Sequence, residues 1–477
     1  MATQDVIQAY QRAKSEVDSR PSDATAVFNL AWWGAKAGHF TDAIAAYEQS
    51  IALGLMGAEE AMSNIASIYS ERLGDVAAAR QWLAQALQRN DRYFPAVFNT
   101  AHIAEQCGDR AIALEFFERA LALQPADDYV LARLCEALLE AGDDHPRIIA
   151  LRRAATRGDP DVLFALARVE ERLGNIDAAW KAMAAANDRD AQRLGTWPTA
   201  KVRELNLRAL ADGSGWDAHD GLSTSAVLTD NGPEAASQGV PLFIVGMFRT
   251  GSTLLEQILS AHSAFMPLGE SEFWPRTVAK LGGSMLAPGQ LPDAALAMTI
   301  KSQFWRHVAD RGIDVQRWVT DKRPDNLFHL PLILRTLPQA RVVITQRDWR
   351  DTLVSVYGTR LHGQHAYATD ISKIAEQIAL CNEIAAICAE KWPNRIYIQN
   401  YENLISDPED QLKRLFKWLG LSWEPSCLDF HLQRNSVRTA SVWQVREPLN
   451  NSRLARWRHY EPQLRAALGD KVDSPEP

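Results

Sequence analysis

A loop after a predicted strand has the residue types and spacing of a phosphate-binding turn. The apolar run PLFIVG, residues 241–246, indicates a buried parallel strand, and an amphipathic helix follows the loop. The loop contains one cation, Arg249, and ends in Gly251, Ser252 and Thr253. In this geometry, backbone N–H groups and the positive end of the helix converge on an anion. Nucleotide P-loops carry lysine where Ser252 stands, so the loop favours a donor other than a nucleoside triphosphate. The alternative is a glycine-rich turn without a ligand.

A second segment places an arginine at the end of another predicted strand. Residues 341–345, RVVIT, are predicted to form a buried strand, Arg347 follows it, and a helix is expected to begin near Asp348. Ser355 lies eight residues after Arg347, about two turns into that helix. A guanidinium can bind a phosphate bidentately, and a serine hydroxyl can complete the site. The alternative is an ion pair of Arg347 with Asp348 or Asp351 on a solvated helix end. Two phosphate motifs on neighbouring strands are more specific than either motif alone.

Both motifs resemble those of the sulfotransferases that use PAPS (3'-phosphoadenosine-5'-phosphosulfate). The segment IVGMFRTGSTLLEQIL, residues 244–259, is similar to their 5'-phosphosulfate loop, with Phe248 in place of the usual proline. The spacing from Arg347 to Ser355 resembles their 3'-phosphate motif. The chain is most similar to bacterial members that join tetratricopeptide (TPR) repeats to this domain and are related to tyrosylprotein sulfotransferases. The resemblance implies a P-loop-like α/β domain, a central parallel sheet flanked by helices, with PAPS as co-substrate, PAP as product and no metal.

The same resemblance implies roles for individual residues. Arg249 and Lys322 are expected to stabilise charge on the leaving phosphate oxygen, and Glu270 to take the proton of the acceptor hydroxyl. By itself Lys322 could also be a solvated loop residue. The alternative bases are Glu272, His262 and His329. The residues expected to contact the nucleotide are Arg249, Thr250, Gly251, Ser252, Thr253, Arg347, Ser355, Tyr401, Ser441 and Arg456, with Arg446 a weaker candidate.

The N-terminal residues repeat with a period near 34, as TPR repeats do. The repeating glycines are Gly38, Gly74, Gly108, Gly142 and Gly174, and small residues follow most of them at fixed distances. A glycine permits the tight turn of a helical hairpin, and small residues permit close helix packing. We therefore predict an all-α TPR solenoid over 1–190, a linker or connecting helix over 191–239, and the sulfotransferase domain over 240–477. The solenoid either binds a peptide acceptor in a groove or only stabilises or dimerises the enzyme.

The amino-acid composition and net charge argue against several classes of function. The net charge of -8 argues against broad affinity for nucleic acid, which requires a basic surface. The five cysteines are scattered, which fits a reducing compartment and matches no zinc spacing. No apolar run reaches the length of a membrane span, and the first residues do not resemble a signal peptide, so we expect a cytoplasmic protein.

Three functions remain in competition at this point. The first is sulfuryl transfer from PAPS to an acceptor hydroxyl of a peptide, a carbohydrate or a small alcohol or phenol, with a homodimer as one assembly. The second is a TPR scaffold whose catalytic half binds PAP without transfer, suggested by Phe248 and by Gln346, which replaces a family arginine. The third is a kinase or NTPase, for which Asp321 would be the nearest magnesium ligand, but the P-loop lysine is missing.

Overall fold

The computed structural model describes residues 4–195, 197–211, 239–282, 291–361, 365–433, 437 and 443–477. These residues form two compact units. The first unit runs to Ala154 and includes Val437; the second begins at Ala155 and holds the rest of the described chain. In the described ranges, no helix combines the length and the apolar composition needed to cross a bilayer.

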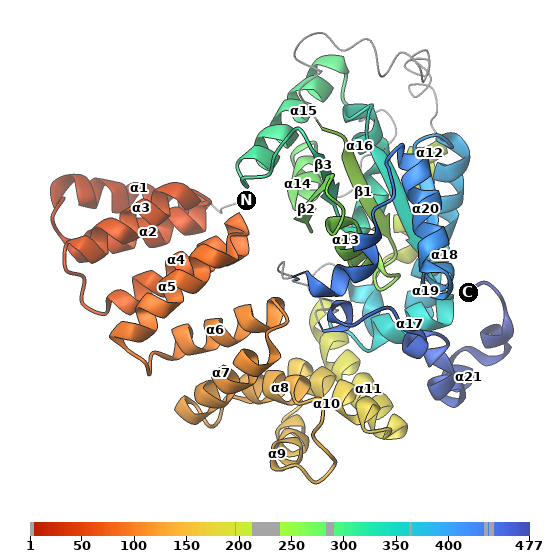
Figure 1. Cartoon of the computed structure of the whole chain (residues 1–477), viewed down its shortest axis with the longest axis horizontal. Helices are drawn as coiled ribbons and strands as arrows, with labels where there is room; N and C mark the ends of the chain where they lie inside the picture. Colours follow the sequence, from red (N-terminus) through yellow and green to blue (C-terminus); the bar gives the residue numbers. More distant parts are fainter. Residues whose placement is uncertain are drawn as a thin grey trace. The chain divides into compact units, whose positions relative to one another are not determined.

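The first unit is built of helical hairpins, drawn in red to orange in Figure 1. Three of the repeating glycines, Gly38, Gly74 and Gly108, have φ values of 92°, 78° and 79°, which glycine adopts without strain. The small residues that follow are fully buried between helices, as Ala79 and Ala113 are. The helices are α1 (Gln4–Ser19), α2 (Ala24–Ala37), α3 (Phe40–Ala52), α4 (Ala58–Ile68), α5 (Val76–Arg89), α6 (Phe94–Gln106), α7 (Arg110–Leu123), α8 (Asp128–Ala137) and α9 (Pro146–Ala155). The predicted all-helical repeat region is confirmed.

The second unit contains a parallel five-stranded sheet, in the order β2-β3-β1-β4-β5. The strands are β1 (Pro241–Gly246), β2 (Phe265–Gly269), β3 (Trp318–Asp321), β4 (Arg341–Gln346) and β5 (Ile396–Asn400). The chain builds β1, β2 and β3 on one side and then crosses to β4 on the other. Ligands of open α/β sheets bind at the carboxyl edge where the strand order reverses, which here is between β1 and β4.

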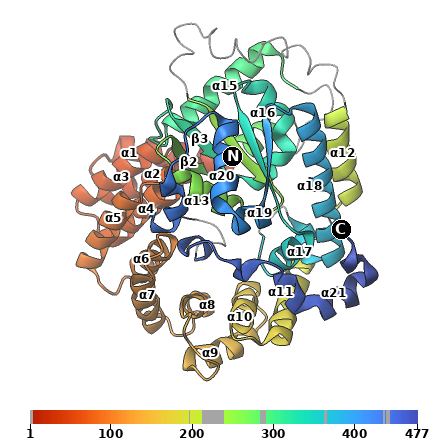
Figure 2. The same cartoon turned by 45° about the vertical axis from the view of Figure 1, so that its right-hand side comes forward.

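Helices cover both faces of this sheet (Figures 1 and 2). Leu242 and Ile244 of β1 pack on one face against α13 and α20, while Phe243 and Val245 pack on the other against α15 and α16. The helices are α13 (Ser252–Ser260), α14 (Phe273–Lys280), α15 (Ala294–Ala309), α16 (Leu330–Thr336), α17 (Trp349–Tyr357), α18 (Ile371–Lys391), α19 (Tyr401–Ser406), α20 (Pro408–Leu419) and α21 (Glu461–Leu468). The α/β class predicted for this half is confirmed.

Three helices that precede the sheet in sequence belong to the same compact unit. They are α10 (Pro160–Arg172), α11 (Ile176–Leu194) and α12 (Thr199–Ala211). Arg360, which follows α17, donates to Asp190 of α11 at 2.8 Å and to Asp161 of α10 at 2.7 Å. Trp180 of α11 lies 5.1 Å, centroid to centroid, from Tyr357 of α17. The last two helices that keep the repeat spacing are thus part of the core around the sheet.

Candidate active site

The two predicted phosphate motifs lie side by side. Strand β1 pairs with β4, with Gly246 opposite Thr345, so both strands end at the same edge. Arg347 follows β4 there, and its Nη1 lies 3.5 Å from the carbonyl oxygen of Arg249 in the loop after β1. The structure therefore brings the glycine loop and Arg347 together, as the sequence analysis anticipated.

The loop after β1 is held in a tightly turned form. Arg249 and Gly251 have positive φ values of 71° and 97°. Thr250 is buried; its hydroxyl donates to the carbonyl of Met247 and pairs with the hydroxyl of Thr345, both at 2.7 Å. The side chain of Thr250 thus links the loop to β4.

Gly251 occupies a position where no other residue fits. A Cβ atom there would lie 2.6 Å from the ring of Tyr401, below any real contact distance. Gly251 is also the N-cap of α13, and the buried Ser252 and Thr253 begin that helix. The helix N-terminus therefore opens at the strand edge, where its N–H groups favour an anion.

Arg249 connects the loop to the second motif. Its Nε donates to the hydroxyl of Ser355 on α17 at 3.0 Å, so the cation of the first motif and the serine of the second form one site. Partial burial and the positive charges of Arg347 and Arg456 lower the pKa of the Arg249 guanidinium. Such repulsion among buried guanidinium groups is relieved by a bound anion.

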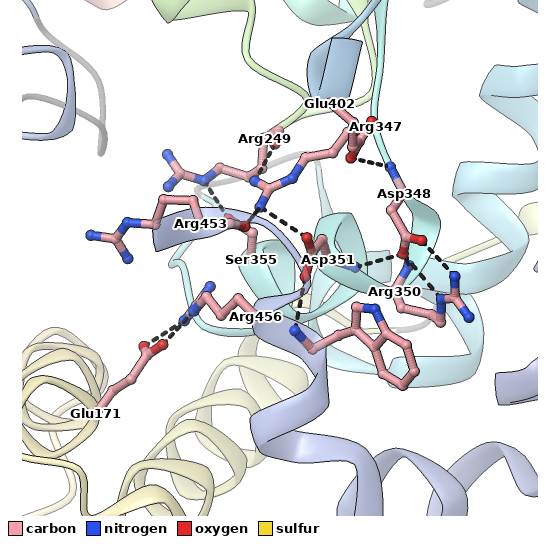
Figure 3. Close-up of polar contacts among 11 residues, drawn as sticks. Glu171, Arg249, Arg347, Asp348, Arg350, Asp351, Ser355, Glu402, Arg453 and Arg456 are labelled. Carbon is pink, nitrogen blue, oxygen red and sulfur yellow. Dashed lines mark hydrogen bonds and ion pairs between the residues drawn. The ribbon is translucent and has the colours of Figure 1, made fainter. Parts of the chain in front are cut away.

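Arg347 is buried and makes several contacts, shown in Figure 3. Its Nη2 donates to the carbonyl of Arg453 at 2.6 Å and lies 3.4 Å from Asp351, and its guanidinium stacks on the ring of Tyr401 at 4.5 Å. The pairing with Asp351, expected only on a solvated helix end, occurs here with both side chains at most 8% exposed. Asp348 instead caps α17 and pairs with a neighbouring arginine. The buried Nε of Arg347 has no partner among the described residues.

The segment around Arg453 reaches the site from the C-terminal end of the chain. The N–H of Trp457 donates to Asp351 at 2.8 Å, so this carboxylate contacts both Arg347 and the C-terminal segment. Arg456, predicted to contact the nucleotide, forms a two-point ion pair with Glu171 of α10, with Nη2 to Oε2 at 2.5 Å. Figure 3 shows the side chains of Arg249 and Arg453 extending to the same side.

The predicted catalytic pair forms a direct contact. Lys322 Nζ lies 2.5 Å from Glu270 Oε1, and the backbone N–H of Lys322 donates to the carbonyl of Gly269 at 2.9 Å. The Lys322 side chain is 2% exposed and that of Glu270 is 42% exposed, so the lysine is held within the fold while the carboxylate faces outward. Because β3 pairs in parallel with β1, and β2 in parallel with β3, this pair lies at the same sheet edge as the arginines.

Two further carboxyl groups lie beneath this pair. Glu256 of α13 is 5% exposed, and burial raises its pKa to about 7, with Lys322 opposing and Glu270 adding to the shift. The hydroxyl of Thr320 donates to Glu256 at 3.4 Å. Burial also raises the pKa of Asp321, which accepts a hydrogen bond from Asn326 at 3.2 Å. Glu256 was not anticipated from the sequence, because an amphipathic helix gives no sign of which carboxylate turns inward.

The alternative bases occupy other surroundings. His262 uses both ring nitrogens, one with the carbonyl of Ser422 at 2.8 Å and one with the N–H of Ala264 at 3.0 Å. His329 is buried, and burial lowers its pKa to about 4. Glu272 is 59% exposed and pairs with Arg276 at 3.1 Å on the surface.

Three other residues were predicted to contact the nucleotide, namely Tyr401, Ser441 and Arg446. Tyr401 lies against both the loop and Arg347, and burial raises the pKa of its hydroxyl. Ser441 lies outside the described residues. Arg446 donates to the carbonyl of Gln433. The sequence analysis missed Glu171 and the role of Asp351, which pair with residues more than 100 positions away.

Comparisons with known proteins agree with the two halves of the chain. Residues 241–425 match the model of the sulfotransferase family, and residues 59–93 and 94–127 match the tetratricopeptide repeat. An uncharacterized protein of Aquifex aeolicus (strain VF5) is 26% identical over 411 residues, which cover 81% of this chain and 51% of that protein.

Two relatives are named protein-tyrosine sulfotransferases. Protein-tyrosine sulfotransferase 2 of Gallus gallus is 24% identical over 242 residues, covering 46% of this chain and 64% of the relative. The Drosophila melanogaster protein is 24% identical over 268 residues, covering 50% and 53%. The chain thus spans about half to two thirds of the length of these relatives. Among solved structures, the sulfotransferase domain of the Synechococcus PCC 7002 olefin synthase aligns with a TM-score of 0.36 and 20% identity, covering 46% of this chain and 88% of that domain.

Proposed function

Because this chain belongs to the sulfotransferase family and carries tetratricopeptide repeats, we propose that it transfers a sulfuryl group from PAPS to an acceptor hydroxyl. The observation that carries the proposal is the joining of two anion-binding motifs at the ends of adjacent parallel strands, β1 and β4. One motif is the N-terminus of α13, and the other is Arg347 with Ser355. PAPS differs from ATP in carrying a 3'-phosphate as well as a 5'-phosphosulfate, so it requires two such motifs.

Four arginines, Arg249, Arg347, Arg453 and Arg456, form an arginine cluster at this edge of the sheet. Its positive charge supports binding of an anionic ligand that carries more than one charge. The positive charges of Arg347, Arg453 and Arg456 all lower the pKa of Arg249. Two carboxylates lie beside these cations, Asp351 next to Arg347 and Glu171 next to Arg456. Ser355 accepts a hydrogen bond from Arg249, so the motif proposed for the 3'-phosphate adjoins the loop proposed for the 5'-phosphosulfate. The α13 N-terminus then faces the 5'-phosphosulfate, which needs no P-loop lysine.

The proposed chemistry is an in-line displacement at sulfur. The acceptor oxygen forms a bond to sulfur while the bond from sulfur to the 5'-phosphate oxygen breaks, and the electron pair leaves with PAP. Glu270 takes the hydroxyl proton, and Lys322 and Arg249 stabilise the charge that develops on the phosphate oxygen. The 2.5 Å contact between Lys322 and Glu270 supports these roles, because it holds the proposed base next to the cation proposed to stabilise the leaving oxygen.

We propose a peptide side chain as the acceptor. The named relatives are protein-tyrosine sulfotransferases, and TPR arrays commonly present a concave surface to peptides. The repeats of this chain would then bind the peptide.

Radiolabelled PAPS provides the direct test. The purified chain is incubated with PAPS carrying a labelled sulfur and with lysate of the producing cell, and the product is separated into protein, carbohydrate and small-molecule fractions. We expect label in protein, released as a sulfated side chain on hydrolysis. PAP binding without any labelled product would instead indicate a scaffold. ATP turnover that depends on magnesium would support the kinase class and contradict the proposal.

A further inference from the structure

We infer that Glu171 of α10 is a positioning residue for the nucleotide site, and this inference rests on the proposed function. Glu171 holds Arg456, Arg456 holds the C-terminal segment 453–457, and that segment presents the guanidinium of Arg453 to the anion. A helix that follows the TPR spacing thereby completes the binding site of the catalytic half.

The ion pair between Glu171 and Arg456 holds both side chains in one orientation. Both guanidinium contacts of Arg456 go to the two oxygens of Glu171, and the side chains are 13% and 15% exposed. A bidentate pair that is shielded from water holds its partners in one orientation. The pairing also lowers the pKa of Glu171 against the opposing effect of burial, so this carboxylate is ionised at neutral pH.

The backbone next to Arg456 is shaped for this contact. Ala455 has a positive φ of 55°, a conformation that non-glycine residues rarely adopt. Such a residue needs support from both sides. On one side the carbonyl of Arg453 accepts from Arg347 at 2.6 Å, and on the other the N–H of Trp457 donates to Asp351 at 2.8 Å. Glu171 adds the third support through Arg456.

This arrangement gives Arg453 and Arg456 different roles. Arg456 is directed to Glu171, whereas the Arg453 side chain is exposed and extends to the same side as Arg249 in Figure 3. The positive charges of Arg453 and of Arg168, another residue of α10, both act on Arg249. Arg453 is therefore the residue that contacts the phosphate, and the Glu171–Arg456 pair sets its position.

A double-mutant cycle tests this coupling. PAP dissociation constants are measured by calorimetry for the full chain, Glu171→Gln, Arg453→Ala and the double variant. We expect each single variant to bind PAP roughly 10- to 100-fold more weakly, the loss of about one charged hydrogen bond. In the double variant, Glu171→Gln should add little, because Arg453 is already gone. The loss of thermal stability from Glu171→Gln should persist in both backgrounds, which separates positioning from a merely structural role.

Glu118→Gln is a matched control. Glu118 also forms a two-point ion pair with an arginine, Arg147, but within the first unit, and the variant should leave PAP affinity unchanged. If Glu171→Gln does not fold, Glu171→Asp keeps the charge on a shorter side chain and should bind PAP several-fold more weakly.

The outcomes separate this inference from the proposed function. Unchanged or tighter PAP binding by Glu171→Gln or by its substitute Glu171→Asp would overturn the inference, and tighter binding would mean that Glu171 competes with the ligand for Arg456. Additive losses in the double variant would also overturn it, because Arg456 would then contact the nucleotide independently of Arg453. A full chain that binds no PAP would contradict the proposed function itself.

Discussion

The arginine cluster and the Lys322–Glu270 pair lie at the same edge of one sheet but are built on opposite electrostatic principles. In the cluster, burial and then the positive charges of neighbouring guanidinium groups lower the pKa of Arg249, and the site holds an excess of positive charge. In the pair, one ammonium group meets one carboxylate at 2.5 Å and the charge is balanced locally. An excess of positive charge suits binding of an anion, whereas a balanced pair suits movement of a proton. Binding and transfer should therefore be separable by mutation.

The largest effect is expected on kcat when Glu270, the proposed proton acceptor, is replaced. Glu270→Gln keeps the shape of the side chain but cannot take a proton, and we expect kcat to fall by about 10²- to 10⁴-fold. PAP affinity should stay within about twofold, because the arginine cluster is unchanged. Steady-state rates with labelled PAPS and calorimetry with PAP measure the two quantities.

The neighbouring exposed carboxylate provides the control for that experiment. Glu272→Gln should retain full activity, since Glu272 pairs with Arg276 on the surface. A Glu270→Gln variant with normal kcat would show that another group accepts the proton, and the proposed separation between the two regions would then fail.

The next effect concerns Glu256, the buried carboxyl group beneath the pair. Its pKa is about 7 in the folded protein, above the ordinary 4.5, so the folded state keeps a proton that the unfolded chain releases. The free energy of unfolding should therefore fall as pH rises from about 4.5 to 7, by roughly 3 kcal/mol in all. Glu256→Gln should remove this slope and make the protein more stable than wild type at pH 8. Urea unfolding at several pH values tests the prediction.

Glu409→Gln is the control for the pH series, because Glu409 is an exposed residue of α20 paired with Lys413. The control should follow the wild-type profile. If Glu256→Gln retains the wild-type slope, then Glu256 is not the group that titrates between pH 4.5 and 7.

The smallest effect of the three is expected for one arginine of the cluster. Arg347→Ala removes a buried cation next to the loop, and we expect PAP to bind roughly 10- to 100-fold more weakly, as for the loss of one charged hydrogen bond. At saturating PAPS, kcat should change little. Arg276→Ala, at a 57% exposed arginine, should leave both unchanged. Equal losses in kcat and affinity for Arg347→Ala would show that Arg347 also takes part in transfer.

The sequence was sufficient for those features that follow from local patterns. The segments 241–246 and 341–345 are short and mostly apolar. Both were predicted to be buried strands, and both are strands. The glycine spacing predicted helical hairpins, and Gly38 and Gly74 have the left-handed φ that such turns need. Each of these signals lies within one window of sequence, where burial and backbone preference dominate.

Contacts between distant residues left no such signal. The Arg249–Ser355 hydrogen bond joins residues 106 positions apart, and the Glu171–Arg456 pair joins residues 285 apart. Nothing in the residues around Glu171 distinguishes it from any charged residue on a repeat helix. Only packing of α10 into the second unit brings it to the site. The predicted boundary at 190 follows the repeat spacing and stays a prediction, while the compact units divide at Ala154.

The pairing of β1 with β4 constrains how this site can change in evolution. Successive residues of a strand point to opposite faces, so inserting or deleting one residue in β4 would turn Thr345 away from Thr250 and shift Arg347 off the loop. The loop and the helices can vary in length without this penalty. Related enzymes that diverge in the acceptor they modify should therefore differ in their insertions between strands, while the lengths of these two central strands stay constant.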